Sequence, residues 1–187
     1  IENQILMACD INLGRLEPCK DSVGGIIAVY IGGAYTSGLL NAPADGGVTI
    51  TGDEITGFAA PLTFYKYDLK GANSFDQVNE NSRENGTSFW TQTGTVALKK
   101  QDKTTTAQMK LLSYGRPQII VQDYNDNYYL AGIQNGCEVA VSTVTGAGMG
   151  DLNGYNLVIT GMEKSPANFI ISSIIGDTTN TVIVLGT

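Results

Sequence analysis

The stretch FYKYDLKGANSFDQVNENSRENGTSFWTQTGTVALKK, residues 64–100, decides how this chain folds. Phe64, Lys66 and Asp68 alternate with three apolar or aromatic neighbours, as the two sides of a strand do. Val96 and Leu98 continue a similar alternation near the end of the stretch. The polar residues between these segments carry no catalytic constellation. We therefore expect a long β-hairpin over about residues 64–100, which suits assembly with a neighbouring subunit better than chemistry.

The rest of the chain also favours short strands joined by turns. It has 187 residues, of which 42% are hydrophobic, enough for one substantial core. Its 23 glycines lie among many Thr, Asn, Val and Ile residues, a composition typical of a mainly β protein. The apolar run at residues 26–31 predicts a buried strand. Further strands are expected at residues 48–51, 54–58, 118–123, 128–133, 138–144 and 155–162.

One helix is expected, at about residues 102–114. Asp102 has the side chain of an N-cap, and Ala107, Leu111 and Tyr114 recur near helical spacing. A Gly and a Pro directly after this segment end it.

The chain is expected to form a single domain, residues 1–187, with an arm at each end. Residues 1–13 form the expected N-terminal arm and residues 170–187 the C-terminal arm. The apolar segments 169–175 and 181–185 are either an internal strand pair or a strand added to the sheet edge of a neighbour.

The charge pattern argues against tight binding of nucleic acid. The net charge is −7, and residues 1–63 carry most of the acidic excess. Proteins that hold nucleic acid tightly cluster Lys and Arg on one face, and the single dense cluster here is Lys99, Lys100 and Lys103. A solvated strand end explains that cluster.

Metal, disulfide and membrane signals are weak. The chain has no histidine, and Cys9, Cys19 and Cys137 lack CxxC spacing, so common zinc and iron sites cannot be assembled. Buried, reduced thiols formed in a reducing cytoplasm are the favoured interpretation, with a Cys9–Cys19 bridge left open. No apolar run reaches the roughly 18 residues that span a bilayer, and no signal peptide is evident.

No catalytic residue is predicted, and the chain is not expected to be an enzyme. Asp53 with Glu54, or Glu80 with Glu84, are the available carboxylate pairs. Adjacent strand residues point to opposite faces, and the second pair lies in the polar stretch. Without histidine, a Ser or Cys nucleophile lacks its usual base.

Residues 123–127 begin like a calcium loop. Asp123, Asn125 and Asn127 match the first three ligand positions. Tyr128 then stands where glycine is needed, and Gln134 where a bidentate Glu belongs. An Asn- and Asp-rich hairpin turn is the favoured interpretation, and no metal or cofactor is predicted.

Two glycine-containing segments are interpreted as turns. Residues 146–150, GAGMG, lack the spacing and the following helix of a phosphate-binding loop. Asn85, Gly86 and Thr87 form a glycosylation sequon, for which a tight turn is favoured because no secretory signal accompanies it.

Several stretches together resemble a known family. They are MACD (residues 7–10), GRLEPCKDSVGG (14–25), YDLKG (67–71), RENGTSF (83–89), YGRP (114–117), MGDLNGY (149–155) and GMEKSPA (161–167). They are similar to virion structural proteins of tailed bacteriophages, above all the tail tube (major tail) proteins. The resemblance covers most of residues 7–169.

The resemblance implies a β-sandwich or half-barrel subunit that joins five copies of itself in a hexameric ring. Rings stack into the tail tube of the virion after assembly in the host cytoplasm. Tape measure protein and a tail terminator or sheath are implied as further partners, and no membrane is involved. DNA passes through the lumen during ejection without specific binding, and an acidic chain suits a passage that repels phosphate.

On this interpretation the polar part of residues 64–100 reaches an adjacent subunit or ring. The residues expected at that inter-subunit contact are Asn73, Phe75, Asp76, Glu80, Arg83 and Glu84.

Two alternatives stay open at this point. A capsid decoration or head-to-tail connector protein would share a β-rich, acidic sequence. A glycan-binding β-domain is the alternative from another class, because Trp90 and the nine tyrosines offer aromatic faces to sugars.

Overall fold

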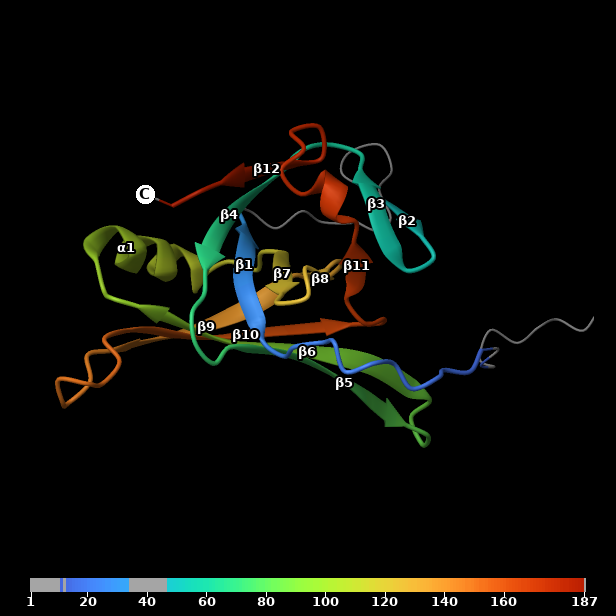
Figure 1. The fold of residues 1–187 in the computed structure, drawn as a ribbon, viewed down its shortest axis with the longest axis horizontal. Helices are drawn as coiled ribbons and strands as arrows, with labels where there is room; N and C mark the ends of the chain where they lie inside the picture. Colours follow the sequence, from blue (N-terminus) through green and yellow to red (C-terminus); the bar gives the residue numbers. More distant parts are fainter. Residues whose placement is uncertain (1–10, 12, 34–46, 187) are drawn as a thin grey trace, which may run out of the picture.

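The computed structural model describes residue 11, residues 13–33 and residues 47–186 (Figure 1). The elements, in chain order, are β1 (Ile26–Gly32), β2 (Val48–Thr51), β3 (Glu54–Phe58), β4 (Leu62–Asp68), β5 (Ser74–Ser82), β6 (Thr87–Lys99), α1 (Lys103–Leu112), β7 (Ile119–Asp123), β8 (Tyr128–Ala131), β9 (Cys137–Val144), β10 (Gly154–Glu163), β11 (Asn168–Ile170), the 3-10 turn η1 (Ser172–Ile174) and β12 (Thr181–Val184). The prediction of a mainly β fold with one helix is confirmed, with 49% of the described residues in strands.

Two sheets make up the fold. Eight strands form a curled half-barrel in the order β12-β4-β1-β7-β8-β11-β3-β2, and four strands form a second sheet in the order β5-β6-β10-β9. In Figure 1 the four-stranded sheet lies beneath the half-barrel, and α1 lies at one end of the molecule. The sandwich or half-barrel expected from the sequence is therefore the observed architecture.

The apolar run of β1 serves two cores because both of its faces are buried. Val29 and Ile31 pack in the layer between the two sheets, whereas Ala28 and Tyr30 pack inside the curl of the half-barrel. Alternate strand residues point to opposite faces, so a continuous apolar run requires cover on both sides. The strand predicted at residues 26–31 is confirmed.

The four-stranded sheet buries one face only. In β10, Tyr155, Leu157 and Ile159 are at most 2% exposed and pack in the core between the sheets. The alternate side chain of Val158 is 42% exposed. The alternation predicted for Val96 and Leu98 of β6 is also confirmed, since both are buried in the same core.

The predicted hairpin over residues 64–100 is wrong in its pairing. β4 pairs with β1 and β12 in the half-barrel, and the strand that pairs with β6 is β5. The supposed loop is thus mostly strand. Between β4 and β5 the chain crosses from one sheet to the other, through a turn in which Gly71 has a φ of +100°, a conformation that glycine adopts without strain.

The helix begins as predicted and turns one face inward. Asp102 caps it by accepting a hydrogen bond from the backbone N–H of Thr105 at 2.7 Å. Met109 is the buried residue of α1, whereas Leu111 and Tyr114 are 64% and 78% exposed. The face of α1 that packs inward therefore does not carry Leu111 and Tyr114. Tyr155 from β10 fixes the start of the helix, because its hydroxyl donates to the Asp102 carbonyl oxygen.

The end of the chain adds to the half-barrel of its own subunit. β11 pairs with β3 and β8, and η1 follows where the sequence predicted a longer strand, residues 169–175. β12 runs parallel to β4 at the sheet edge. Most of the expected N-terminal arm, residues 1–13, lies outside the described residues, which begin with Ile11 and continue from Leu13.

Candidate functional site

The four-stranded sheet presents an uncovered face made largely of small polar side chains. Register and burial assign to this bare face Ser74, Asp76, Val78 and Glu80 of β5; Phe89, Thr91, Thr93, Thr95, Ala97 and Lys99 of β6; Asn156, Val158, Thr160 and Met162 of β10; and Glu138, Ala140, Ser142 and Val144 of β9. One row crosses all four strands through paired residues, from Asp76 through Thr93 and Thr160 to Glu138. Such a surface is broad and evenly polar.

The charges on the bare face are mostly negative. Asp76, Glu80 and Glu138 carry acidic groups, and Lys99 at the end of β6 carries a basic one. Apolar side chains lie among these charges: Val78 stands between Asp76 and Glu80 on β5, and Val158 and Met162 are on β10. All three are about half exposed. A face of this sign repels a phosphate backbone in the absence of bound cations.

Both edges of the four-stranded sheet are open. β5 and β9 are the outer strands, and no strand in the described part of the chain pairs with the outer side of either. β5 has nine residues with neither Pro nor Lys, the residues that commonly protect an edge. Unpaired N–H and C=O groups on such an edge can accept a further strand.

Five of the six residues predicted at an inter-subunit contact lie at or near this edge. Phe75 is half-buried, Asp76 and Glu80 are exposed on β5, and Arg83 and Glu84 are exposed in the turn to β6. Asn73 differs because it is only 5% exposed. Its side chain is buried because it forms hydrogen bonds within the same chain.

Asn73 holds the crossing between the sheets in place. Its side-chain oxygen accepts a hydrogen bond from the backbone N–H of Ala97 at 2.8 Å, and its amide donates to the Gly71 carbonyl oxygen. Both contacts lie within one subunit, so Asn73 shapes the start of β5 and is not part of the exposed contact surface.

The β5–β6 hairpin is ordered by its own polar side chains. Thr91 donates a hydrogen bond to a Glu80 carboxylate oxygen at 2.7 Å, and the Asn79 amide donates to the Ser88 hydroxyl. Residues 83–86 form the turn. Its last residue, Gly86, has a φ of +63°, a left-handed conformation. The turn predicted at the sequon is therefore confirmed.

Two buried polar groups under this sheet, Gln92 and Glu163, were not predicted from the sequence. Gln92 is 1% exposed and accepts a hydrogen bond from the backbone N–H of Gly132 at 2.9 Å. Glu163 is 3% exposed and accepts from the backbone N–H groups of Gln134 and Asn135. The sequence signal that could have identified them is a polar residue at a position that alternation assigns to the buried face, as with Gln92 in β6 and Glu163 in β10.

Burial raises the pKa of two ionisable groups in this layer, Glu163 and Cys137. It raises the pKa of Glu163, and the two backbone hydrogen bonds oppose that rise. It also raises the pKa of the Cys137 thiol to about 12, with the nearby Glu163 charge adding to the effect. The prediction of a buried thiol is confirmed for Cys137. Cys19 is exposed, and Cys9 lies outside the described residues, so the Cys9–Cys19 bridge is not tested.

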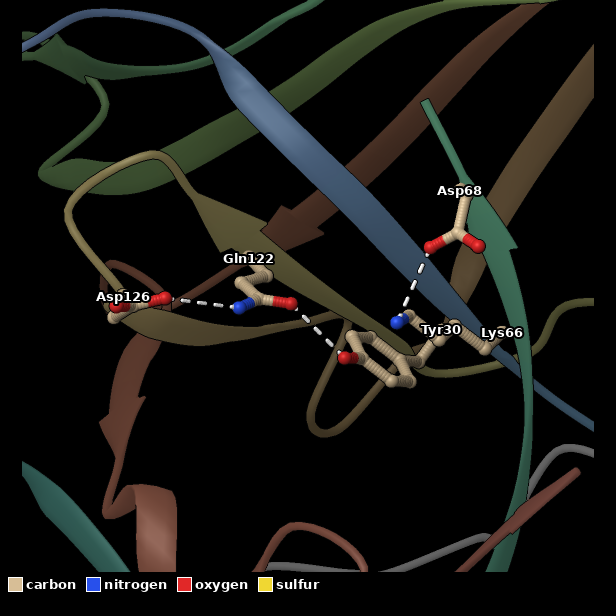
Figure 2. Close-up of polar contacts among 5 residues, drawn as sticks. All are labelled: Tyr30, Lys66, Asp68, Gln122 and Asp126. Atoms are coloured by element: carbon tan, nitrogen blue, oxygen red, sulfur yellow. Dashed lines mark hydrogen bonds and ion pairs between the residues drawn. The ribbon is translucent and has the colours of Figure 1, made fainter. Parts of the chain in front are cut away.

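A chain of polar contacts crosses the half-barrel inside its curl (Figure 2). Lys66 forms a 3.1 Å ion pair with Asp68 and lies 5.9 Å from the ring centre of Tyr30. The Tyr30 hydroxyl donates to Gln122, whose amide in turn donates to Asp126. These contacts tie β4, β1 and β7 together. Burial and the neighbouring Tyr128 raise the pKa of Tyr30, so its hydroxyl stays a hydrogen-bond donor to Gln122 at a pH where an exposed tyrosine ionises.

The turn that begins like a calcium loop is stabilised by its own backbone. Asp123 accepts hydrogen bonds from the N–H groups of Asn125 and Asn127 at 2.8 Å each. Burial acts to raise the Asp123 pKa, but the bonds from Asn127 and Asn125 outweigh it and leave the pKa below its ordinary value. The predicted hairpin turn is confirmed.

The remaining candidates lie in turns. Asp53 occupies the β2–β3 turn with a φ of 66°. Asp151 closes the glycine-rich loop by accepting from the N–H groups of Ala147 and Gly148, which lowers its pKa. Within residues 13–33 and 47–186, no group of three potential metal ligands occurs, and no helix is long and apolar enough to cross a membrane.

Comparisons with known proteins identify no relative. No family model matches the chain, and neither the curated proteins nor the solved structures include a match.

Proposed function

We propose that this chain is the self-assembling subunit of a phage tail tube, in which hexameric rings stack into a conduit for DNA. The observation that carries the proposal is the four-stranded sheet, which has one bare face and two open edges. A sheet with these properties can continue from copy to copy around a ring. The resemblance of residues 7–169 to tail tube proteins supplies the expected symmetry.

In such a ring the bare face lines the lumen. Its threonine, serine and alanine side chains offer few groups that would hold a passing chain. Asp76, Glu80 and Glu138 give it an acidic character that keeps DNA from adhering. Like charges act over about 8–10 Å in physiological salt, so the repulsion works close to the wall. The protein performs no chemistry in this role, and tape measure protein and a terminator or sheath are its further partners.

Electron microscopy of the purified protein tests the proposal directly. Hollow filaments with sixfold end views are expected. A protein that stays monomeric at high concentration contradicts it, and trimers or twelvefold rings favour a capsid decoration or connector protein instead.

A substitution at the open edge gives a sharper test. Val78, 59% exposed on β5, is replaced by lysine, because an edge lysine hinders strand addition. The Val78→Lys variant should keep the melting temperature of the wild type and fail to form filaments. Thr178→Lys, at an exposed position outside both sheets, is the matched control and should assemble normally. Normal filaments from Val78→Lys would overturn the assigned edge.

A further inference from the structure

The described residues before β1 carry apolar side chains into solvent. Residues 13–24, called the arm below, include Leu13 and Leu16, which are 88% and 91% exposed, and Ile11 just before them is 96% exposed. Single exposed apolar residues are common on monomers. Three large ones in one short segment, none of them in either core, indicate a segment that binds a surface.

The base of the arm is fixed to the subunit. The Asn125 side chain accepts a hydrogen bond from the backbone N–H of Val23 at 3.0 Å and donates one to the Val23 carbonyl oxygen at 2.8 Å. This pair of bonds imitates the pairing of a strand. In Figure 1 the arm, in blue, runs from β1 toward the end of the molecule opposite α1. The arm therefore extends away from the helix of its own copy.

A matching groove lies at the α1 end. It is about 200 Å³ in volume and open to solvent, between the second half of α1 and the ends of β1 and β4. Apolar side chains dominate its lining, among them Tyr65, Tyr67, Leu111, Leu112 and Pro117. Leu111 and Tyr65 are 64% and 44% exposed. An apolar cavity of about 150 Å³ holds benzene, which is larger than a leucine side chain, so the groove has room for one.

The charges of the two ends are complementary. Residues 99–116, which include α1, hold five of the chain's 11 Lys and Arg residues and one acidic residue, Asp102. At the other end, where the arm runs, lie the β2–β3 and β5–β6 turns. Their charged residues are Asp53, Glu54, Glu80, Glu84 and one basic residue, Arg83. Opposite charge on opposite ends favours head-to-tail association of identical copies.

We propose that the arm of one copy binds the α1 groove of the next, with Leu13 and Leu16 against the exposed side chains of the groove. Because arm and groove lie at opposite ends, the contact is heterologous: it leaves the groove of the first copy and the arm of the second free to bind further copies. Copies therefore associate without limit along one direction. The inference rests on the proposed function, in which it supplies the contact between stacked rings.

The exposed thiol of Cys19 provides the test, because it lies three residues from Leu16. In a Cys9→Ser background, Gln108→Cys places a second thiol on the lining of the groove. Cys137 stays unreactive because burial raises its pKa to about 12. Mild oxidation followed by non-reducing electrophoresis should give a ladder of dimers, trimers and larger species.

Thr178→Cys in the same background is the matched control and should give no ladder. A ladder with Gln108→Cys that stops at dimers contradicts head-to-tail association. Monomers alone, or equal ladders from both variants, overturn the assignment of the groove.

Charge substitutions test the apolar contact. Leu16→Asp and Leu111→Asp should each weaken self-association by about tenfold or more in sedimentation experiments, as expected for an apolar anchor. Ser22→Asp adds the same charge to the arm without removing an apolar side chain, and it should change association less than about twofold. Equal effects from Leu16→Asp and Ser22→Asp would contradict the contact.

The outcomes separate this inference from the proposed function. Wild-type tubes without a Gln108→Cys ladder would overturn the arm contact and leave the tube function standing. A ladder from a protein that forms only open, solid filaments would support the arm contact and contradict the tube. The absence of both ladder and filaments would overturn both.

Discussion

The two sheets of this protein bury their side chains differently. The strands at the centre of the half-barrel are apolar on both faces, because one face meets the four-stranded sheet and the other lines the curl. The four-stranded sheet is apolar toward the half-barrel and polar on its bare face. The half-barrel therefore holds the subunit together, and the four-stranded sheet combines that role with an uncovered surface.

The buried positions of the four-stranded sheet serve folding, whereas the positions on its bare face have no packing role within the described residues. Along β10, neighbouring residues such as Leu157 and Val158 belong to these two classes alternately. Substitutions at a buried position and at the adjacent exposed position should thus have unequal effects on stability.

The largest expected effect is at Leu157, which is 1% exposed between the sheets. Leu157→Ala should lower the free energy of unfolding by about 2–5 kcal/mol, because it leaves a cavity in a close-packed core. Val158→Ala, one residue along on the bare face, should change it by less than about 0.5 kcal/mol. Urea unfolding followed by circular dichroism measures both, and equal losses would contradict the two-face division.

A smaller effect is expected at Gln92, the buried amide under the bare face. Gln92→Leu removes the acceptor of the Gly132 N–H, and leaving a buried donor unpaired costs about 1–3 kcal/mol. The Gln92 Nε2 group has no hydrogen-bond partner among the described residues, so its removal offsets part of that cost. We expect a net loss of about 1 kcal/mol. The same unfolding experiment checks it, and a gain in stability would show that the Gly132 bond contributes little.

A pH effect is expected from Glu163. Its pKa in the folded protein is raised above the ordinary value of 4.5, so the folded state holds the proton more tightly than the unfolded state. The resulting stability is present below pH 4.5 and is lost as pH rises through the raised pKa.

Glu163→Gln keeps an acceptor for the two N–H groups and has no carboxyl proton to lose. Its free energy of unfolding should fall less than that of the wild type as pH rises from about 4 through the raised pKa of Glu163. Identical slopes for the two proteins would contradict the raised pKa. Glu138→Gln, on the bare face of the same sheet, is the matched control.

The smallest effect is expected at Thr95, an exposed position at the centre of the bare face. Thr95→Lys should change the free energy of unfolding by less than about 0.5 kcal/mol, because the lysine side chain stays in solvent. A loss above 1 kcal/mol, of the size typical for buried positions, would show that this face is packed within the subunit. Thermal unfolding of the dilute protein measures the change.

Much of the fold followed from local patterns in the sequence. The Asp102 cap, the turn at Asp123 and the strands at residues 26–31 and 54–58 were all predicted, since each depends on residues close together in the chain. Capping bonds and side-chain alternation are local interactions, so one sequence suffices to find them.

The surface around β5 was harder to predict. The residues after Phe75 that alternate away from the bare face are Gln77, Asn79 and Asn81, and the last two are exposed, so hydrophobic alternation did not identify β5 as a strand. Gln77 is instead held by tertiary contact, accepting a hydrogen bond from the backbone N–H of Ala167, 90 residues away. The buried role of Asn73 depends equally on a distant partner, Ala97.

By itself the sequence determined a mainly β chain with one capped helix and the residues that alternate along most strands. Only the tertiary structure decided that β4 joins the half-barrel while β5 joins β6, and that α1 turns Met109 inward and Leu111 outward. Alternation states which side chains share a face, and it does not state which strand or sheet will cover that face. The long-range packing of the two sheets makes that choice, and so determines which surfaces remain exposed.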